Sequence, residues 1–98
     1  MASGIGTATL DFGAHPGSNE ASVAVTGQAS ISGTSKAEAF IMADDTTADH
    51  TASDHRYAEL FMSLTCGTPS AGVGFTIYAT AIDKLTGQFA VRYVWSDG

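Results

Sequence analysis

The chain has 98 residues, of which 44% are hydrophobic and only 14% are charged, and its formal net charge is −6. That length accommodates one domain, residues 1–98, and leaves no room for a second. The four basic residues are scattered and no apolar run approaches the roughly 18 residues of a membrane span, so we expect neither a nucleic-acid nor a membrane partner.

Cys66 is the only cysteine, so no internal disulfide can form and nothing indicates an oxidising compartment. No basic residue precedes Lys36 and the N-terminus has no apolar run, a pattern that differs from a secretory signal. We therefore expect synthesis in a cytoplasm. The Gly, Ala, Ser and Thr content favours close contacts between subunits, which predicts a homo-oligomer.

The first two strands are predicted from alternation. Residues 4–12 place Ala8, Leu10 and Phe12 on one face of a half-buried strand, and the turn formers of residues 13–19 follow. A second strand begins at Ala21 and continues to residue 32, broken or bulged at Gly27.

The middle of the chain is less regular. Residues 37–43 contain three consecutive large apolar side chains, which predicts a central strand that is covered on both faces. Residues 44–56 are polar without an apolar period, so we expect an exposed connection. Residues 57–66 fit both strand and helix spacing, and we favour a strand because the segment ends in Thr65-Cys66-Gly67.

The last third contains two alternating segments, 75–81 and 89–95, which we expect to form a hairpin around a turn at 83–87. The second segment has the strongest apolar face of the chain. Such a stripe is typical of sheet core or of a subunit contact more often than of a ligand-stacking platform, and we predict that this face is an interface with other subunits or with a shell. Its residues are Phe89, Val91, Tyr93 and Trp95. Together the segments predict an all-β fold, an antiparallel β-sandwich of the jelly-roll or immunoglobulin-like kind with about 6–7 strands.

The densest group of possible metal ligands lies between residues 44 and 55 and comprises Asp44, Asp45, Asp49, His50, Asp54 and His55. The two histidines are five residues apart, which separates them on a strand and on a helix. The aspartates also miss the alternate-residue spacing of a calcium-binding EF-hand loop. We therefore predict a solvated connection and no metal site.

Catalytic chemistry has no sequence support either. No Gly-x-Ser-x-Gly elbow is present, and Cys66 lies in an apolar stretch that is typical of an inert packing thiol. The pairs Gly4-Ile5-Gly6 and Gly72-Val73-Gly74 lack the strand and helix that phosphate binding requires. We predict no catalytic residues, no cofactor and no enzymatic activity.

Several segments resemble a family of small, uncharacterised virion proteins of tailed bacteriophages. They are GIGTATLDFG (4–13), PG (16–17), ASVAVTGQ (21–28), ADHTASDH (48–55), GFTIY (74–78) and VRYVW (91–95). The family often has a longer insertion before its last strand than residues 79–88 provide.

This resemblance implies a non-enzymatic structural protein that is synthesised in the host cytoplasm and located in the virion. The expected role is a capsid decoration or cement protein that binds the shell through β-sheet surfaces, with a phage capsid or tail protein as partner. A tail-associated structural protein and a carbohydrate-binding β-sandwich module are the alternatives.

Overall fold

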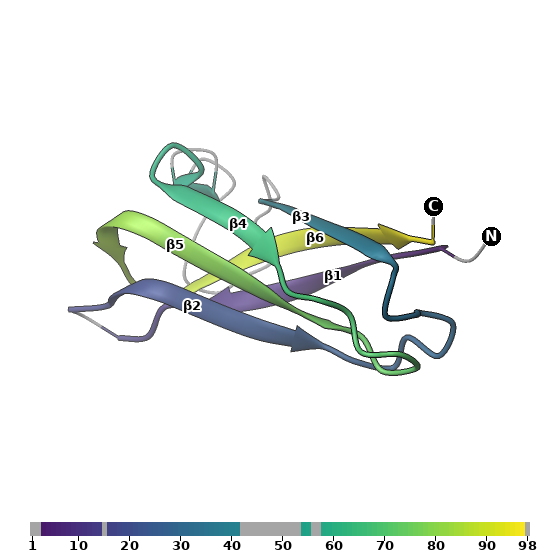
Figure 1. Ribbon diagram of the computed structural model, residues 1–98. Coiled ribbons are helices and arrows are strands. Elements are labelled where there is room, and N and C mark those ends of the chain that lie inside the picture. Colours follow the sequence, from purple (N-terminus) through teal and green to yellow (C-terminus); the bar gives the residue numbers. More distant parts are fainter. Residues whose placement is uncertain (1–2, 15, 42–53, 56–57, 98) are drawn as a thin grey trace.

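The computed structural model describes residues 3–14, 16–41, 54–55 and 58–97, and these residues form two packed antiparallel sheets (Figure 1). The six strands are β1 (Ser3–Asp11), β2 (Ser18–Val25), β3 (Lys36–Ile41), β4 (Met62–Cys66), β5 (Phe75–Leu85) and β6 (Gln88–Ser96). Sheet A has the order β1-β6-β3 and sheet B the order β2-β5-β4. The predicted all-β antiparallel sandwich is confirmed.

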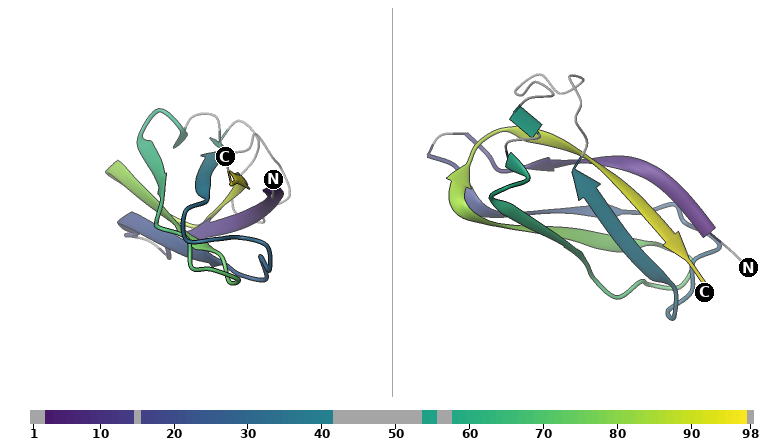
Figure 2. Two further views of the ribbon diagram at one scale, coloured as in Figure 1. Left: turned by 45° about the vertical axis from the view of Figure 1, so that its right-hand side comes forward. Right: turned by 90° about the horizontal axis from the view of Figure 1, so that it is seen from above.

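A bent two-stranded ribbon forms the centre of the fold. β1 pairs with β6 in sheet A, and their continuations β2 and β5 pair in sheet B. Both strands bend at the same place: the amide of Phe12 donates to the carbonyl of Gly87 at 2.9 Å, and the amide of Gly87 donates to Gly13 at 2.9 Å. The view from above shows β5 curving into β6 at one end of the molecule (Figure 2, right).

The predicted hairpin between the last two strands is therefore wrong. β5 and β6 lie in different sheets, although only Thr86 and Gly87 separate them. Gly87 has φ 77°, a left-handed conformation that turns the chain from one sheet into the other. Two linking residues suit a hairpin and a sandwich corner equally well, so local sequence does not distinguish them.

The prediction that residues 37–43 form a central strand is also wrong. β3 is an edge strand of sheet A, and it pairs only with β6 among the described strands. Its inward residues are half-buried, while Phe40 is 52% exposed on the outer face. Residues 42 and 43 lie outside the described residues.

Two predicted strands are shorter in the structure. β2 ends at Val25 and Gly27 has φ 75°, so the predicted continuation to residue 32 is a connection between the sheets. β4 begins at Met62, while Asp54, His55 and Ala58 have helical backbone and residues 59–61 form a turn. The strand that we favoured for residues 57–66 is thus present from Met62 onward, and Ala58 is the one described residue of this segment with helical backbone.

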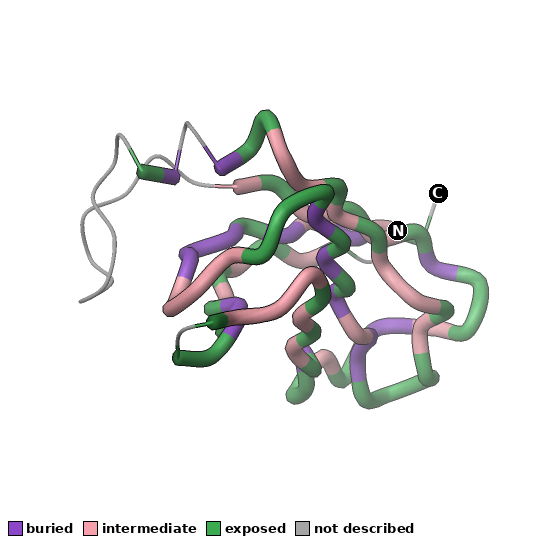
Figure 3. The backbone as a smooth tube through the Cα atoms, turned by 90° about the vertical axis from the view of Figure 1, so that its left-hand side faces the viewer, coloured by how far each residue is buried: buried purple, intermediate pink, exposed green. Residues whose placement is uncertain are grey.

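The core is built from the inward-facing side chains of β6, and two glycines of β1 lie against two of them. Gly4 pairs with Trp95 and Gly6 with Tyr93, and a Cβ at either glycine would collide with the facing ring. The side-chain amide of Gln28 bonds to the polar groups of both rings. Trp95 Nε1 donates to Gln28 Oε1 at 2.9 Å, and Gln28 Nε2 donates to the Tyr93 hydroxyl at 3.4 Å. Buried and exposed positions alternate along the strands as a two-layer sandwich requires (Figure 3).

We predict that Gly6→Ala destabilises the fold by about 1 to 3 kcal/mol, because the added methyl group overpacks the space filled by the Tyr93 ring. Urea unfolding measures the loss. Gly33→Ala is the matched control, since a Cβ there meets no atom within 4 Å. Equal stability of the two variants would contradict the close approach of β1 to the ring.

Candidate interaction surfaces

The four residues predicted to form an interface are core residues. Phe89, Val91, Tyr93 and Trp95 are 2%, 0%, 8% and 3% exposed, and they point between the two sheets. β6 is also the central strand of sheet A, with β1 and β3 on its two sides, so its backbone offers no free edge. A partner could reach these side chains only by opening the sandwich, and we correct the interface prediction for them.

His55 is a structural residue of the core. Its side chain is fully buried, which contradicts its predicted place in a solvated connection. The ring packs edge-on against Phe89 with centroids 5.1 Å apart, and Nε2 accepts a hydrogen bond from the amide of Ala90 at 2.9 Å. The described pairing of β3 with β6 reaches Ile41 opposite Val91, and His55 provides the acceptor for the preceding amide of β6, that of Ala90.

Most of the candidate metal ligands lie outside the described residues, namely Asp44, Asp45, Asp49 and His50. Asp54 is exposed and His55 is buried, and the Nε2 atom of His55 is occupied by the amide of Ala90. Within the part of the chain that the structure describes, no three His, Cys, Asp or Glu side chains are grouped so as to hold a metal ion.

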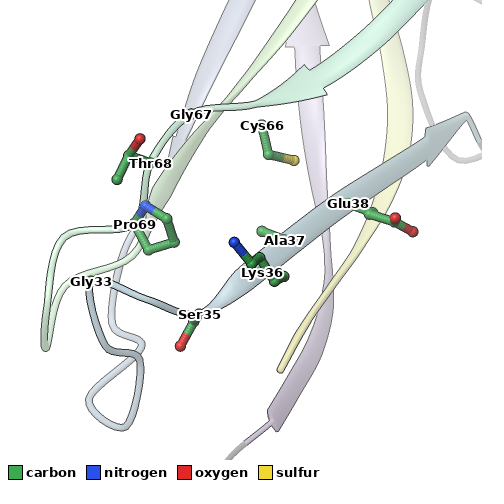
Figure 4. Close-up of a pocket in the computed structure, with 9 residues that line it drawn as sticks. All are labelled: Gly33, Ser35, Lys36, Ala37, Glu38, Cys66, Gly67, Thr68 and Pro69. Atoms are coloured by element: carbon green, nitrogen blue, oxygen red, sulfur yellow. The ribbon is translucent and has the colours of Figure 1, made fainter. Parts of the chain in front are cut away.

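A groove of about 430 Å³ lies between the start of β3 and the end of β4, where the edges of the two sheets meet (Figure 4). Cys66 points from β4 toward β3 in this groove. Burial raises the pKa of the Cys66 thiol, and the negative charge of Glu38 raises that pKa further. A thiol that is held protonated in this way is a weak nucleophile at neutral pH.

The outer face of sheet A exposes apolar side chains on two strands. The register places Ile5, Val94 and Glu38 in one row across the sheet, and Thr7, Arg92 and Phe40 in the next. Ile5 is 66% exposed and Phe40 is 52% exposed, while Val94 is partly buried between its neighbours. This face therefore combines apolar area with charged side chains at outward positions. The basic ones are Arg92 and Lys36, and the acidic ones are Glu38 and Asp11.

The outer face of sheet B is hydroxyl-rich and contains a shallow groove of about 310 Å³. Tyr78 is 49% exposed beside this groove, and Glu20, Ser22 and Thr80 also line it. The Tyr78 ring covers Gly67 of the neighbouring connection, where an added Cβ would lie 3.2 Å from the ring. The ring is thus supported on one side while part of it faces water.

Leu60 and Ile82 are the most exposed large apolar residues that the structure describes, at 74% and 76%. Ile82 belongs to the outer face of sheet B, and its amide donates to the carbonyl of Phe61, next to Leu60, at 2.8 Å. The two residues therefore lie at the same end of sheet B, and we refer to them as the apolar pair.

Sequence reasoning missed these surfaces, although a signal for them exists. Ile5 and Ile82 each occupy a position in the set of alternate residues that is otherwise polar. On β1 the other members of that set include Thr7 and Thr9, and on β5 they include Thr76 and Thr80. An apolar residue in the outward phase of a strand is the pattern that points to a contact surface.

Comparison with protein families, with curated proteins and with solved structures gives no match for this chain. Among the described residues, no helix has the length and apolar character needed to cross a membrane.

We predict that His55→Ala lowers the free energy of unfolding by about 2 to 4 kcal/mol, because it opens a cavity and removes the acceptor of Ala90. His55→Phe retains a ring but not the acceptor, so it should lose about 1 to 3 kcal/mol. Denaturant unfolding compares both variants with His50→Ala, for which the sequence predicts almost no effect. A silent His55→Ala would contradict the structural role.

Proposed function

We propose that this chain is a non-enzymatic structural protein of a bacteriophage virion that decorates the capsid. Its partner in this role is the capsid shell, to which it binds through the outer face of sheet B, so its location is the virion. The observation that carries the proposal is the apolar pair of Leu60 and Ile82, whose side chains are about three-quarters exposed.

Two physical arguments support this role. Isolated apolar residues on a surface are common, but two residues at the same end of a sheet that are both about three-quarters exposed gain free energy when a partner covers them. The hydrogen bond between Ile82 and Phe61 fixes the backbone beneath the pair, so little conformational freedom is lost on binding. The resemblance of the sequence to phage virion proteins supplies the partner.

We expect the wild-type protein to sediment with purified capsids of the phage that encodes it when those capsids lack it. The double variant Leu60→Asp/Ile82→Asp should bind at least about tenfold more weakly, because it removes the apolar area and places carboxylates in the contact. Both positions are exposed, so thermal unfolding should change little.

Val73→Asp is the matched control, since Val73 is also an exposed apolar residue but lies in the connection before β5. It should bind capsids as the wild type does. Sedimentation with purified tails and not with capsids would favour the tail-associated alternative, and binding to neither would contradict the virion proposal.

Carbohydrate binding is the second candidate, and the groove beside Tyr78 favours it. A half-exposed aromatic ring can stack on a sugar, while the Glu20 carboxylate and the hydroxyls of Ser22 and Thr80 can bond to its hydroxyl groups. Trp95 is excluded from this role because it is buried.

If the groove binds sugars, Tyr78→Ala should weaken the binding of an oligosaccharide at least about tenfold, since it removes the stacking surface. Calorimetric titration with a panel of bacterial surface oligosaccharides measures this. Val73→Ala, at a position that is equally exposed at 49%, should have no effect. If the wild-type protein binds none of the panel at millimolar concentration, the carbohydrate candidate fails.

A further inference from the structure

The apolar and charged side chains on the outer face of sheet A follow a diagonal arrangement. Three apolar side chains lie along a diagonal of the sheet: Ile5 and Val94 are cross-strand partners, and Phe40 follows on the far side of β6, one row along. Glu38 lies on one side of this diagonal, opposite Val94, and Arg92 lies on the other, opposite Phe40. Val94, Glu38, Phe40 and Arg92 thus form a four-residue block on β6 and β3, with the two apolar residues at one pair of opposite corners and the two charged residues at the other.

Strand geometry makes this arrangement quantitative. Neighbouring strands are about 4.8 Å apart and successive outward residues of one strand are about 6.8 Å apart. The perpendicular bisector of the line from Arg92 to Glu38 then passes close to Ile5, Val94 and Phe40. A twofold axis along the apolar diagonal would therefore exchange the positions of the acidic and the basic side chain.

We infer that the outer face of sheet A binds a second copy of this chain about that axis. The apolar residues of one copy would lie against the same residues of the other, and Arg92 of each copy would face Glu38 of the other. Strands of the two copies would cross at roughly 70°, close to the orthogonal packing of sheets. This inference rests on sheet A alone, so it is independent of the capsid proposal on sheet B.

Charge complementarity favours a second copy over an unrelated partner. Glu38 and Arg92 are exposed and, among the described residues, no ion pair occupies either of them, although diagonal neighbours on a sheet are only about 7 to 8 Å apart. The face is small, with two rows on three strands covering roughly 200 Å² in plane. An interface of this size is weak, so the dimer should form only at high concentration.

Sedimentation equilibrium of the wild-type chain from about 20 µM to about 1 mM should show a mass that rises toward a dimer. Arg92→Glu alone and Glu38→Arg alone should each weaken the association by about tenfold, because each places like charges in contact twice. The double variant Arg92→Glu/Glu38→Arg should restore it. Mixing the two single variants should also restore it, as a heterodimer.

Two controls carry the same charge changes on the opposite sheet, Lys84→Glu and Glu20→Arg, and both positions are exposed. They should leave the association unchanged, and circular dichroism should show that every variant is folded. The inference is overturned if the wild-type chain is monomeric at about 1 mM, or if neither the double variant nor the mixture recovers the dimer. A dimer that is insensitive to both single variants would also overturn it, by locating the contact elsewhere.

Discussion

The fold depends on the close packing of two aromatic rings against glycine. Trp95 and Tyr93 fill the space between the sheets because Gly4 and Gly6, their cross-strand neighbours on β1, have no side chains. A sandwich of this size has few inward positions, so removing two side chains from one strand admits two large rings from the next. The Gln28 amide then satisfies the polar groups of both rings, which makes their burial favourable.

The alternating pattern predicted the strands well, because inward and outward residues differ in polarity over most of their length. It did not predict which strands pair. β5 and β6 read as a hairpin, yet Gly87 directs them into different sheets. Pairing then depends on β1, whose residues precede their partners on β6 by 77 to 93 positions, and on β2, whose residues precede their partners on β5 by 50 to 67. The apolar run at Phe40 suggested a central strand, whereas one of its large residues faces solvent at an edge.

The functional surfaces were harder to predict for a related reason. The sequence identifies an apolar face on β6, but a buried face and a contact face have the same composition. Only the packing of sheet B against this face of sheet A assigns it to the core. His55 was read as a solvated residue because its neighbours are polar. Its burial comes with its contacts to Phe89 and to the backbone amide of Ala90 on β6, which are some 35 residues away in the sequence and which no local pattern contains.

The two outer faces of the sandwich point in opposite directions, and this arrangement changes what weak contacts can achieve. A twofold contact on sheet A closes after two copies, so it cannot form a lattice by itself. The same contact places the two sheet B faces on opposite sides of the dimer, so one shell surface can cover only one of its two apolar pairs and the dimer gains no second contact there. In a copy that binds the shell through sheet B, the outer face of sheet A points away from the shell and stays free for a second copy. The capsid contact and the self-association are therefore separate steps, and the small contact on sheet A need not be strong for a single copy to decorate the shell.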